Sequence, residues 1–481
     1  MSNDFIRSAG DFHIAEAKII SSSGVEVDIN KNNNIAHIKL FENIQQNSIT
    51  GEILLHDSAG YVSELPIIGQ EYLKLKIQTP SINHEVNIID FTKNVFVINS
   101  VQTRGEVGNS ISVYLLSFSS SEIVKNQRTK VADSLDGTYS KIVVDMLDRV
   151  NCRKKLFVEP TKGVKRIVAP NIRPFDVISM ALNSASSSIN ENFSPSYLFF
   201  ENFDGYHFRS LASLYAQPVV QKYTTHQAGG QIQQSGPAKG IANLEAELAN
   251  IIDYEIVENS NTLFNHTTGV LASTLLVHNI YNKSFKQYTY NYFDSFNGEK
   301  HITSYHGKKQ FPIFSDATVE EGLRNSDFPA RTFLESLSEG ETDVNNTTKD
   351  GTEPYAAPDP QNTLQERVST VNQLDRGLIL NISTHGNTII KAGDIVEVDI
   401  PIVASVKVDG GRENDRFYNG VFIVKRIVHE FDFGEKKHGT ILTLVKDSLS
   451  EKLDGPKDQI EPKPKKSARV ISDKETFYPQ L

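Results

Sequence analysis

The chain has 481 residues, of which 49 are Lys or Arg and 59 are Asp or Glu, so its formal net charge is -10. This charge disfavours a generally basic nucleic-acid binder, and the single cysteine, Cys152, excludes an intrachain disulfide framework and a Cys-rich zinc site. No apolar run approaches the roughly 18 residues that cross a bilayer, and residues 1–5 lack the features of a secretory signal. We expect about three domains, made in a reducing compartment and without membrane insertion.

Most of the first 120 residues alternate between apolar and polar positions. Leu73, Leu75 and Ile77, for example, share one face of a predicted strand, and polar turns with Gly or Asn separate most such strands. This period of two is typical of antiparallel strands that bury one face. The sequence therefore predicts a first antiparallel β-barrel over residues 1–130.

The pattern changes to a helical period near residue 131. Residues 142–150 place apolar side chains on one helical face, and Pro174 opens a second helix at the position where its missing N–H costs nothing. Asp204-Gly205 lies between two aromatic-rich runs and is typical of a tight hairpin turn. Two helices and a hairpin predict the first part of an α+β domain over residues 131–216.

Strand-like alternation returns in two later segments. Residues 217–299 and 376–450 are predicted to form the first and second parts of a second β-barrel, with a loop rich in Gly, Gln and Ser at 224–240. Between these segments, residues 300–375 are predicted to form the second part of the α+β domain, with a polar, mobile loop at 338–362. The whole chain is thus expected to be a β-rich α+β multidomain protein.

Local signals predict one further helix in this region. The Thr-Leu-Gln-Glu run that ends at Glu366 matches a capping box. It lies ahead of Val368, Val371 and Leu374, which we expect to form the buried stripe of the helix.

Residues 451–481 are predicted to form an extended C-terminal tail, which supplies our candidate partner-binding residues. The basic cluster of the tail has no interleaved aromatics, which disfavours a nucleic-acid stacking platform. The cluster is either part of a solvated linker or a docking arm for an acidic partner surface. In the second case the tail extends along a neighbour through its basic and apolar side chains, which are Lys463, Lys465, Lys466, Arg469, Ile471, Phe477, Tyr478 and Leu481.

The two strand-rich ends of the chain resemble each other. The similarity covers three pairs of segments: 69–77 with 393–400, 95–101 with 421–427, and Ser110-Ile111 with Thr440-Ile441. Identity is low and alternating strands match by chance, so a repeat and a coincidence are equally open. A true repeat would give one chain two copies of one barrel, and three chains could then form a ring of six similar barrels.

Three stretches also carry a family resemblance through the order of their elements: residues 49–57 leading to the strand after Gly69, the helix after Pro174 with hairpin residues 199–202, and residues 392–394 with 424–431 and 440–445. In this order the chain resembles the central baseplate hub proteins of contractile-tailed, T4-like bacteriophages. The resemblance covers most of residues 1–455. The chain departs from the family at 224–240, at 338–362 and in the tail, so the contacts of these segments stay open.

The resemblance implies a homotrimer that forms a pseudo-sixfold ring, with two tail-tube-like barrels and an α+β domain in each chain. The ring would join the sixfold tail tube protein to the threefold central spike protein. Baseplate wedge proteins, and a tape measure protein, are further implied partners. DNA would pass through the lumen without specific binding, repelled by an acidic lining. The implied protein is a structural part of the virion tail, assembled in the host bacterial cytoplasm, without catalytic residues, cofactor or metal.

Two alternative functions stay open. One is the hub of a related contractile injection system, which would share the fold and symmetry. The other is a tail-associated hydrolase or carbohydrate-binding module. A cleft with convergent carboxylates or aromatics would favour the second alternative, and its place would be near residues 197–211, where Phe199, Tyr206 and Phe208 cluster.

Other candidate chemistry is weak. His429-Glu430 resembles the start of a zinc-protease helix but lacks the second His, and strand alternation would scatter its side chains to two faces. His301 and His306 would point in opposite directions on a strand. The basic residues after Cys152 could depress its thiol pKa, although a structural cysteine at a helix end is the favoured interpretation.

Overall fold

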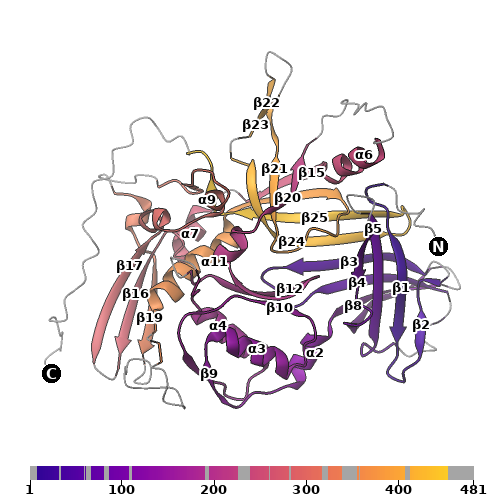
Figure 1. Ribbon diagram of the computed structural model, residues 1–481, viewed down its shortest axis with the longest axis horizontal. Helices are drawn as coiled ribbons and strands as arrows, with labels where there is room; N and C mark the ends of the chain where they lie inside the picture. Colours follow the sequence, from indigo (N-terminus) through magenta and orange to yellow (C-terminus); the bar gives the residue numbers. More distant parts are fainter. Residues whose placement is uncertain are drawn as a thin grey trace.

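The protein, seen here in a computed structural model, is rich in β-strands and has few helices (Figure 1). One fourteen-stranded sheet, mostly antiparallel, extends through it, with smaller sheets beside it. The tail and most of the two predicted loops lie outside the described residues, so the eight partner-binding residues of the tail stay a prediction. The structure describes residues 8–31, 34–58, 60, 67–80, 86–107, 111–189, 194–225, 239–258, 261–280, 283–316, 323–337, 355–356, 358–406, 412–415 and 417–452.

The N-terminal half of the large sheet follows the predicted alternation. Leu73, Leu75 and Ile77 point into a core with no exposed surface, and the lysines between them face the other side. The strands lie in the order β3-β4-β8-β7-β5-β1-β2, with β6 beside β5. They are β1 (His13–Ile20), β2 (Glu26–Asp28), β3 (Ile35–Asn43), β4 (Thr50–Asp57), β5 (Tyr72–Pro80), β6 (Val86–Asp90), β7 (Phe96–Val107) and β8 (Ile111–Ser120).

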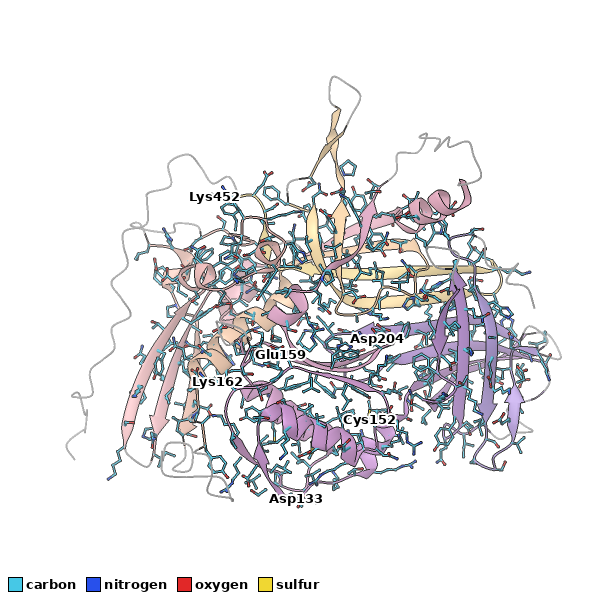
Figure 2. The ribbon with its side chains drawn as sticks, viewed as in Figure 1. Asp133, Cys152, Glu159, Lys162, Asp204 and Lys452 are labelled. Atoms are coloured by element: carbon cyan, nitrogen blue, oxygen red, sulfur yellow. The ribbon has the colours of Figure 1, made fainter. Side chains whose placement is uncertain are left out.

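The two predicted helices and the aromatic hairpin follow in the chain. They pack into one core, whose side chains fill the layer between helices and hairpin (Figure 2). The hairpin turn requires Gly205, which has a φ of +145° and where a Cβ would lie 2.2 Å from the Lys155 carbonyl oxygen. The elements are α2 (Ser121–Arg128), β9 (Ser134–Gly137), α3 (Tyr139–Arg149), β10 (Lys155–Val158), β11 (Lys165–Val168), α4 (Pro174–Ser184), β12 (Tyr197–Asn202), β13 (Gly205–Ser210) and α5 (Leu211–Tyr215).

The C-terminal half of the large sheet comes from two separate parts of the chain. Its strands lie in the order β15-β20-β25-β24, with β21 beside β24 and β14 beside β21. Helix α6 (Lys239–Leu248) lies next to this half, and the hairpin of β22 (Pro401–Val406) and β23 (Arg412–Asn414) projects from it (Figure 1). The strands are β14 (Val219–Thr224), β15 (Ile251–Glu258), β20 (Leu378–His385), β21 (Ile395–Asp399), β24 (Gly420–Asp432) and β25 (Lys437–Lys446).

A separate three-stranded sheet corrects one part of the predicted second barrel. β16 (Ala272–Asn279) and β17 (Ser284–Asn291) were predicted to belong to that barrel, but they pair with β19 (Arg331–Leu337). Alternation identifies a strand but not its partner, so the sequence pattern could not place them. The other short elements here are α7 (Thr262–Thr268), α8 (Tyr292–Ser295), η3 (Phe296–Gly298), α9 (Ile302–Tyr305), β18 (Phe311–Pro312), η4 (Asn325–Asp327) and β26 (Ser448–Leu449).

The predicted capping-box helix exists, but it begins earlier and buries a different face. A π-helical turn, η5 (Gln361–Glu366), runs directly into α11 (Arg367–Arg376), so the capping box is inside the helix. Leu374 is buried as predicted, but Val368 and Val371 are only half-buried. The rest of the buried face is polar: Arg367 donates to the Tyr197 carbonyl at 2.8 Å, and Ser369 donates to the Val270 carbonyl at 2.8 Å. The helix thus joins the hairpin to the separate sheet through hydrogen bonds.

Candidate assembly surface

The two halves of the large sheet repeat one order of strands. In the N-terminal half the order is β3-β4-β8-β7-β5-β1, and in the C-terminal half it is β15-β20-β25-β24-β21-β14. Neighbouring strands are antiparallel in both halves, except that β14 runs parallel to β21. This agreement supports the internal repeat that the sequence left open.

The two halves also share their irregularities. A β-bulge inserts one residue into a strand and bends it. Two such shifts lie at matching places: Ile98/Ser100 in β7 with Val424/Arg426 in β24, and Ile35/His37 in β3 with Ile251/Asp253 in β15. The matching bulges align the two halves up to two further shifts, at Gln102/Gly105 in β7 and Ile256/Glu258 in β15, which have no counterpart in β24 and β3.

Glu71 and Asp394 occupy equivalent places before β5 and β21. Each carboxylate accepts the N–H of the third residue before it, at 2.8 Å and 2.9 Å. Each backbone carbonyl accepts an N–H at 2.8 Å from the neighbouring long strand, from Ile98 and Val424 respectively. One local motif therefore fixes the long strand in both halves.

The bulges correct the predicted alignment of the repeat at its C-terminal end. Phe118 pairs with Ile98 and Leu444 pairs with Val424, and both partners lie directly before the matching bulges of β7 and β24. Phe118 therefore corresponds to Leu444. Ile441 therefore corresponds to Leu115, and its predicted match with Ile111 is wrong by four residues. An alternating strand matches itself at every even shift, so the apolar pattern alone does not fix the register.

Strands β3 and β24 pair antiparallel and join the two halves into one sheet. The pairing covers residues 37–43 and 426–432. On one face, Lys39 and Glu430 lie opposite each other and form an ion pair at 2.7 Å. On the other face, Phe431 is fully buried in the core of the N-terminal half. The C-terminal half therefore contributes a side chain to the N-terminal core.

Glu42 fixes this junction to two loops from elsewhere in the chain. Its fully buried carboxylate accepts the N–H of Phe203 at 3.1 Å and the N–H of Ala392 at 2.9 Å. Burial raises the pKa of Glu42 to about 8, although the two N–H groups act in the opposite direction. The neutral carboxyl group therefore prevails at pH 7.

A buried histidine pair also lies at the junction. His429 and His438 are fully buried, and the Nδ1 of His429 lies 3.2 Å from the Nε2 of His438. Rings of Phe203 and Phe431 stack on the pair. Burial lowers the pKa of His429 to about 3, so its imidazole is neutral at pH 7. As predicted, Glu430 points to the opposite face.

Strand β15 lies at the end of the large sheet and exposes apolar side chains. Ile252, Ile256 and Val257 are 57%, 42% and 50% exposed, respectively. In the equivalent strand β3, which pairs with β24 along its edge, Ile35, Ile38 and Leu40 are buried. No described strand covers the outer edge of β15. The sequence pattern predicted this strand but did not identify it as an uncovered edge.

Strand β7 has a second uncovered edge. Among the described strands, β5 pairs with β7 only at Phe96 and Val97. No strand of the described ranges lies beside the β7 edge over residues 99–107, whereas the equivalent part of β24 pairs with β3. A free strand edge presents unpaired N–H and C=O groups to a further strand. Two complementary free edges are thus present in one chain.

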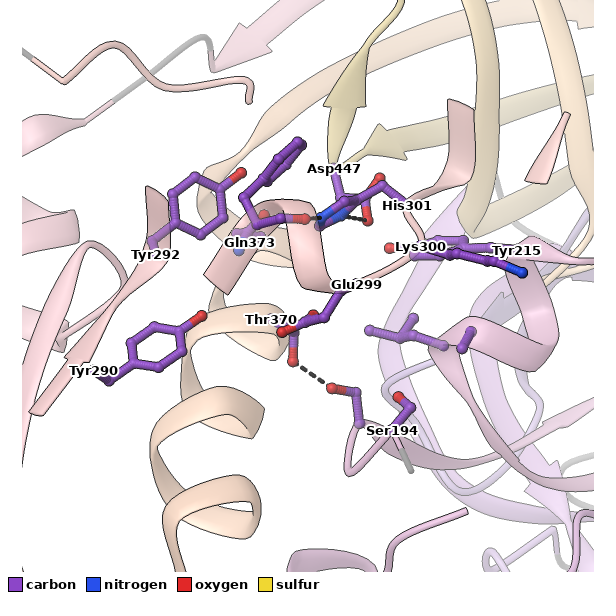
Figure 3. Close-up of a pocket in the computed structure, with 14 residues that line it drawn as sticks. Ser194, Tyr215, Tyr290, Tyr292, Glu299, Lys300, His301, Thr370, Gln373 and Asp447 are labelled. Atoms are coloured by element: carbon purple, nitrogen blue, oxygen red, sulfur yellow. Dashed lines mark hydrogen bonds and ion pairs between the residues drawn. The ribbon is translucent and has the colours of Figure 1, made fainter. Parts of the chain in front are cut away.

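A small cavity near α9 is lined by several ionisable side chains, among them Glu299, His301 and Asp447 (Figure 3). The contacts of His301 show that this residue holds the structure together. His301 lies at the start of α9 and not on a strand. Its Nδ1 lies 2.8 Å from the Asp447 carboxylate, and its Nε2 lies 3.1 Å from the Phe296 carbonyl. Burial lowers the pKa of His301, but Asp447 outweighs it and raises the pKa. With both ring nitrogens engaged by acceptors, the imidazole has no free nitrogen to act as a general base.

The aromatic hairpin does not form the cleft that a hydrolase or sugar-binding module requires. Phe199, Tyr206 and Phe208 are buried in the core against α3 and α4. Cys152 lies at the edge of that core, and burial raises its pKa to about 11, the opposite of the predicted direction. Five glutamates of a polar segment, Glu320, Glu321, Glu335, Glu339 and Glu341, are further candidates for such a site; Glu335 lies on β19, and the other four lie outside the described residues.

Within the described ranges, no group of three or more His, Cys, Asp or Glu side chains is arranged to hold a metal ion. No described helix has the combined length and apolar character that crossing a lipid bilayer requires.

Several solved structures are similar to this chain over most of its length. A tail protein of Neisseria meningitidis MC58 is 10% identical, with a TM-score of 0.49, covering 91% of this chain and 97% of its own. The 43 kDa tail protein of prophage MuSo2 from Shewanella oneidensis is 9% identical, with a TM-score of 0.45, and coverage of 90% and 98%. The E. coli c3393 protein, a type VI secretion component, is 6% identical, with a TM-score of 0.38, and coverage of 90% and 76%.

The first two are described as tail proteins, and the third is a component of the type VI secretion system. No protein-family model matches the chain, and no curated protein matches it. At these identities and TM-scores the likeness assigns neither a particular activity nor a partner. The function is therefore inferred from the geometry of the two sheet halves.

Proposed function

We propose that this protein is the structural baseplate hub of a contractile tail, a homotrimeric ring between the sixfold tail tube and the threefold central spike. The repeated sheet halves, joined edge to edge by β3 and β24, carry this proposal. Three chains with two equivalent halves each would offer six similar units to the tube. The same ring would keep true threefold symmetry for the spike.

In this proposal the two sheet halves are the tube-like barrels. The first barrel is formed by residues 1–130, and the second combines β14 and β15 with the strands of residues 376–450. The remaining helices, the aromatic hairpin and the β16–β17–β19 sheet form the α+β portion. This division keeps the predicted boundaries except within residues 217–299, where β16, β17 and the helical elements α6, α7, α8 and η3 move from the second barrel to the α+β portion.

The sheet face that carries Lys39 and Glu430 is proposed to line the DNA channel. Paired residues of neighbouring strands share this face, so the register identifies its other members. Its carboxylates outnumber its basic groups: Glu52, Asp253, Glu255, Glu430 and Asp432 against Lys39, Arg426 and Lys437. Such a lining would repel DNA phosphates and allow free passage. No DNA binding by the assembled ring is expected at low salt, and tight binding there would contradict this part.

The partners in this proposal are the tail tube protein, the central spike protein, the baseplate wedge proteins and a tape measure protein. The location is the virion tail, assembled in the host bacterial cytoplasm. A non-enzymatic role is supported by the burial of the aromatic hairpin and by the engaged nitrogens of His301. The hub of a related contractile injection system would use the same geometry.

Electron microscopy of the purified chain mixed with its tail tube and spike proteins tests the proposed role. We expect the chain at one end of the tube, with the spike bound on the opposite side of the ring. Binding of neither protein, at concentrations where tube and spike are soluble, would contradict the hub function. A tail assembled without the chain provides the matched negative control.

A further inference from the structure

A short segment from late in the chain lies on the small β9–β11 sheet. The two strands pair antiparallel, and Arg166 of β11 is opposite Asp136 of β9. Tyr355 and Ala356 contact these residues and the turn that precedes β11. The contacting residues Lys165 and Ala356 are 191 positions apart in the sequence. The contact is therefore the docking of one segment on a distant one, and not a local turn.

The Tyr355 side chain is bound at both its hydroxyl group and its ring. The hydroxyl donates to Asp136 Oδ1 at 2.8 Å and accepts from the Arg166 guanidinium at 2.6 Å. The same guanidinium lies over the ring, 4.8 Å from its centroid, in a cation–π arrangement. Arg166 Nε also donates to Asp136 Oδ1 at 2.9 Å, which fixes the two charged side chains relative to each other. Because phenylalanine would lack both bonds of the hydroxyl group, the contact favours tyrosine.

The next position binds the main chain and favours a small side chain. The Ala356 N–H donates to the Val164 carbonyl at 2.9 Å, and the Ala356 carbonyl accepts from Lys165 Nζ at 2.6 Å. Main-chain bonds of this kind are typical of an extended peptide bound beside a strand. Gly163 has a φ of +71°, and a Cβ added there would lie 2.4 Å from the Ala356 Cβ. The close approach therefore requires glycine in the turn and a small residue above it.

The docked residues do not fill the space around them. A hollow of about 380 Å³ continues beside them, lined by Tyr355 and Asp359 of the segment, by Asn183 of α4 and by Glu335 of β19. This volume is within the range of ligand sites. Tyr355 is only half-buried and the Arg166 side chain is 39% exposed. The contact thus lies at the surface, where a second peptide could replace the segment.

We propose that the β9–β11 sheet is a peptide-binding site for a tyrosine followed by a small residue, and that Tyr355 and Ala356 occupy this site within the chain. A partner segment of the same chemistry binds by displacing them. The inference goes beyond the proposed hub function and does not depend on it, because every group of the site belongs to one chain. Ordinary packing of a loop is the alternative, and it predicts no binding of the same segment as a free peptide.

Binding of a synthetic peptide to the full-length chain tests the site. The probe is a fluorescein-labelled peptide with the sequence of residues 351–360, and its fluorescence anisotropy measures binding. The variant that carries Tyr355→Ala and Ala356→Gly leaves the site vacant. In the wild type, the attached segment competes with the peptide at an effective concentration in the millimolar range. We therefore expect the vacant variant to bind the peptide about tenfold more tightly than the wild type.

Two matched controls test the recognition of tyrosine. The same peptide with phenylalanine in place of its tyrosine should bind the vacant variant about tenfold more weakly, because it lacks the two hydrogen bonds of the hydroxyl group. Arg166→Ala, added to the vacant variant, should abolish binding of the tyrosine peptide. Arg166 is a surface residue, so this variant should keep the circular dichroism spectrum of the wild type.

The outcomes separate the proposal from loop packing. Absence of peptide binding by the vacant variant, or equal binding of the tyrosine and phenylalanine peptides, would overturn the site. Equal binding by the wild type and the vacant variant would overturn the occupation of the site by Tyr355 and Ala356. None of these results bears on the hub function, which the tube and spike mixture tests separately.

Discussion

The buried histidine at the junction predicts a specific loss of stability in acid. The pKa of His429 lies at about 3 in the folded chain, below its ordinary value of 6.5. Below pH 6.5 the unfolded chain takes up a proton that the folded chain does not bind. Folding stability is therefore lost as the pH falls from 6.5 toward 3. From pH 7 to pH 5, His429 alone should lower the free energy of unfolding by about 2 kcal/mol.

His429→Leu removes this proton linkage while it keeps an apolar side chain between the Phe203 and Phe431 rings. Urea unfolding at pH 7 and pH 5 measures the effect. We expect the variant to lose about 2 kcal/mol less than the wild type between these two pH values. Titrating groups away from the pair, Glu42 among them, remain in both proteins and cancel in the comparison. His438 contacts His429, but burial is the larger cause of its lowered pKa, so its own proton linkage is largely kept.

Ile427→Val is the matched control, because Ile427 is buried on the same strand and does not titrate. It should cost about 0.5–1.5 kcal/mol at both pH values, so its pH dependence should equal that of the wild type. An equal pH dependence in His429→Leu and the wild type would refute the assignment of a neutral buried histidine to the junction.

Two further substitutions test the core of the chain. Lys154→Met leaves the buried carboxylates of Glu122 and Glu201 without their shared cation, so it should lower the free energy of unfolding by about 3–5 kcal/mol, measured in urea. A variant as stable as the wild type would contradict the buried charge cluster. Gly386→Ala would place a Cβ 2.0 Å from the buried ring of His438 and should cost about 1–3 kcal/mol by the same measurement; a neutral effect would refute this close packing.

Gly105→Ala is the control for the second substitution. An added Cβ at this glycine meets no atom within 4 Å, so overpacking is not expected in the isolated chain. A loss of stability equal to that of Gly386→Ala would show that general glycine replacement, and not the contact with His438, causes the effect.

Local elements of the fold could be predicted from the sequence because their signals are local. The buried alternation of Leu73, Leu75 and Ile77, the start of α4 at Pro174 and the turn at Gly205 all depend on neighbouring residues. Each involves a periodicity or a backbone preference that a short segment carries by itself. The structure confirms these three predictions.

Partnerships between distant segments could not be predicted. The pairing of β3 with β24 joins residues almost 400 positions apart, and the alternating pattern of either strand would fit many partners. The polar buried face of α11 also escaped prediction, because Arg367 and Ser369 are buried through hydrogen bonds to the carbonyls of Tyr197 and Val270. Side-chain polarity alone does not reveal acceptors supplied by other elements.

The candidate assembly surface was missed for a related reason. Residues 251–258 carry a strand pattern, but exposure at an edge depends on which strands are absent beside it. The apolar residues Ile252, Ile256 and Val257 are the sequence signal that was missed. An edge strand with this composition exposes apolar side chains unless another segment or another chain packs against it.

The mass of the purified full-length chain in complex with its central spike protein tests the central claim most directly. Light scattering during size-exclusion chromatography gives the number of 53.7 kDa chains in the complex. The account predicts three copies of the chain for three copies of the spike protein. A single copy, stable as the concentration is raised and in the presence of tube protein, would contradict the ring of repeated halves.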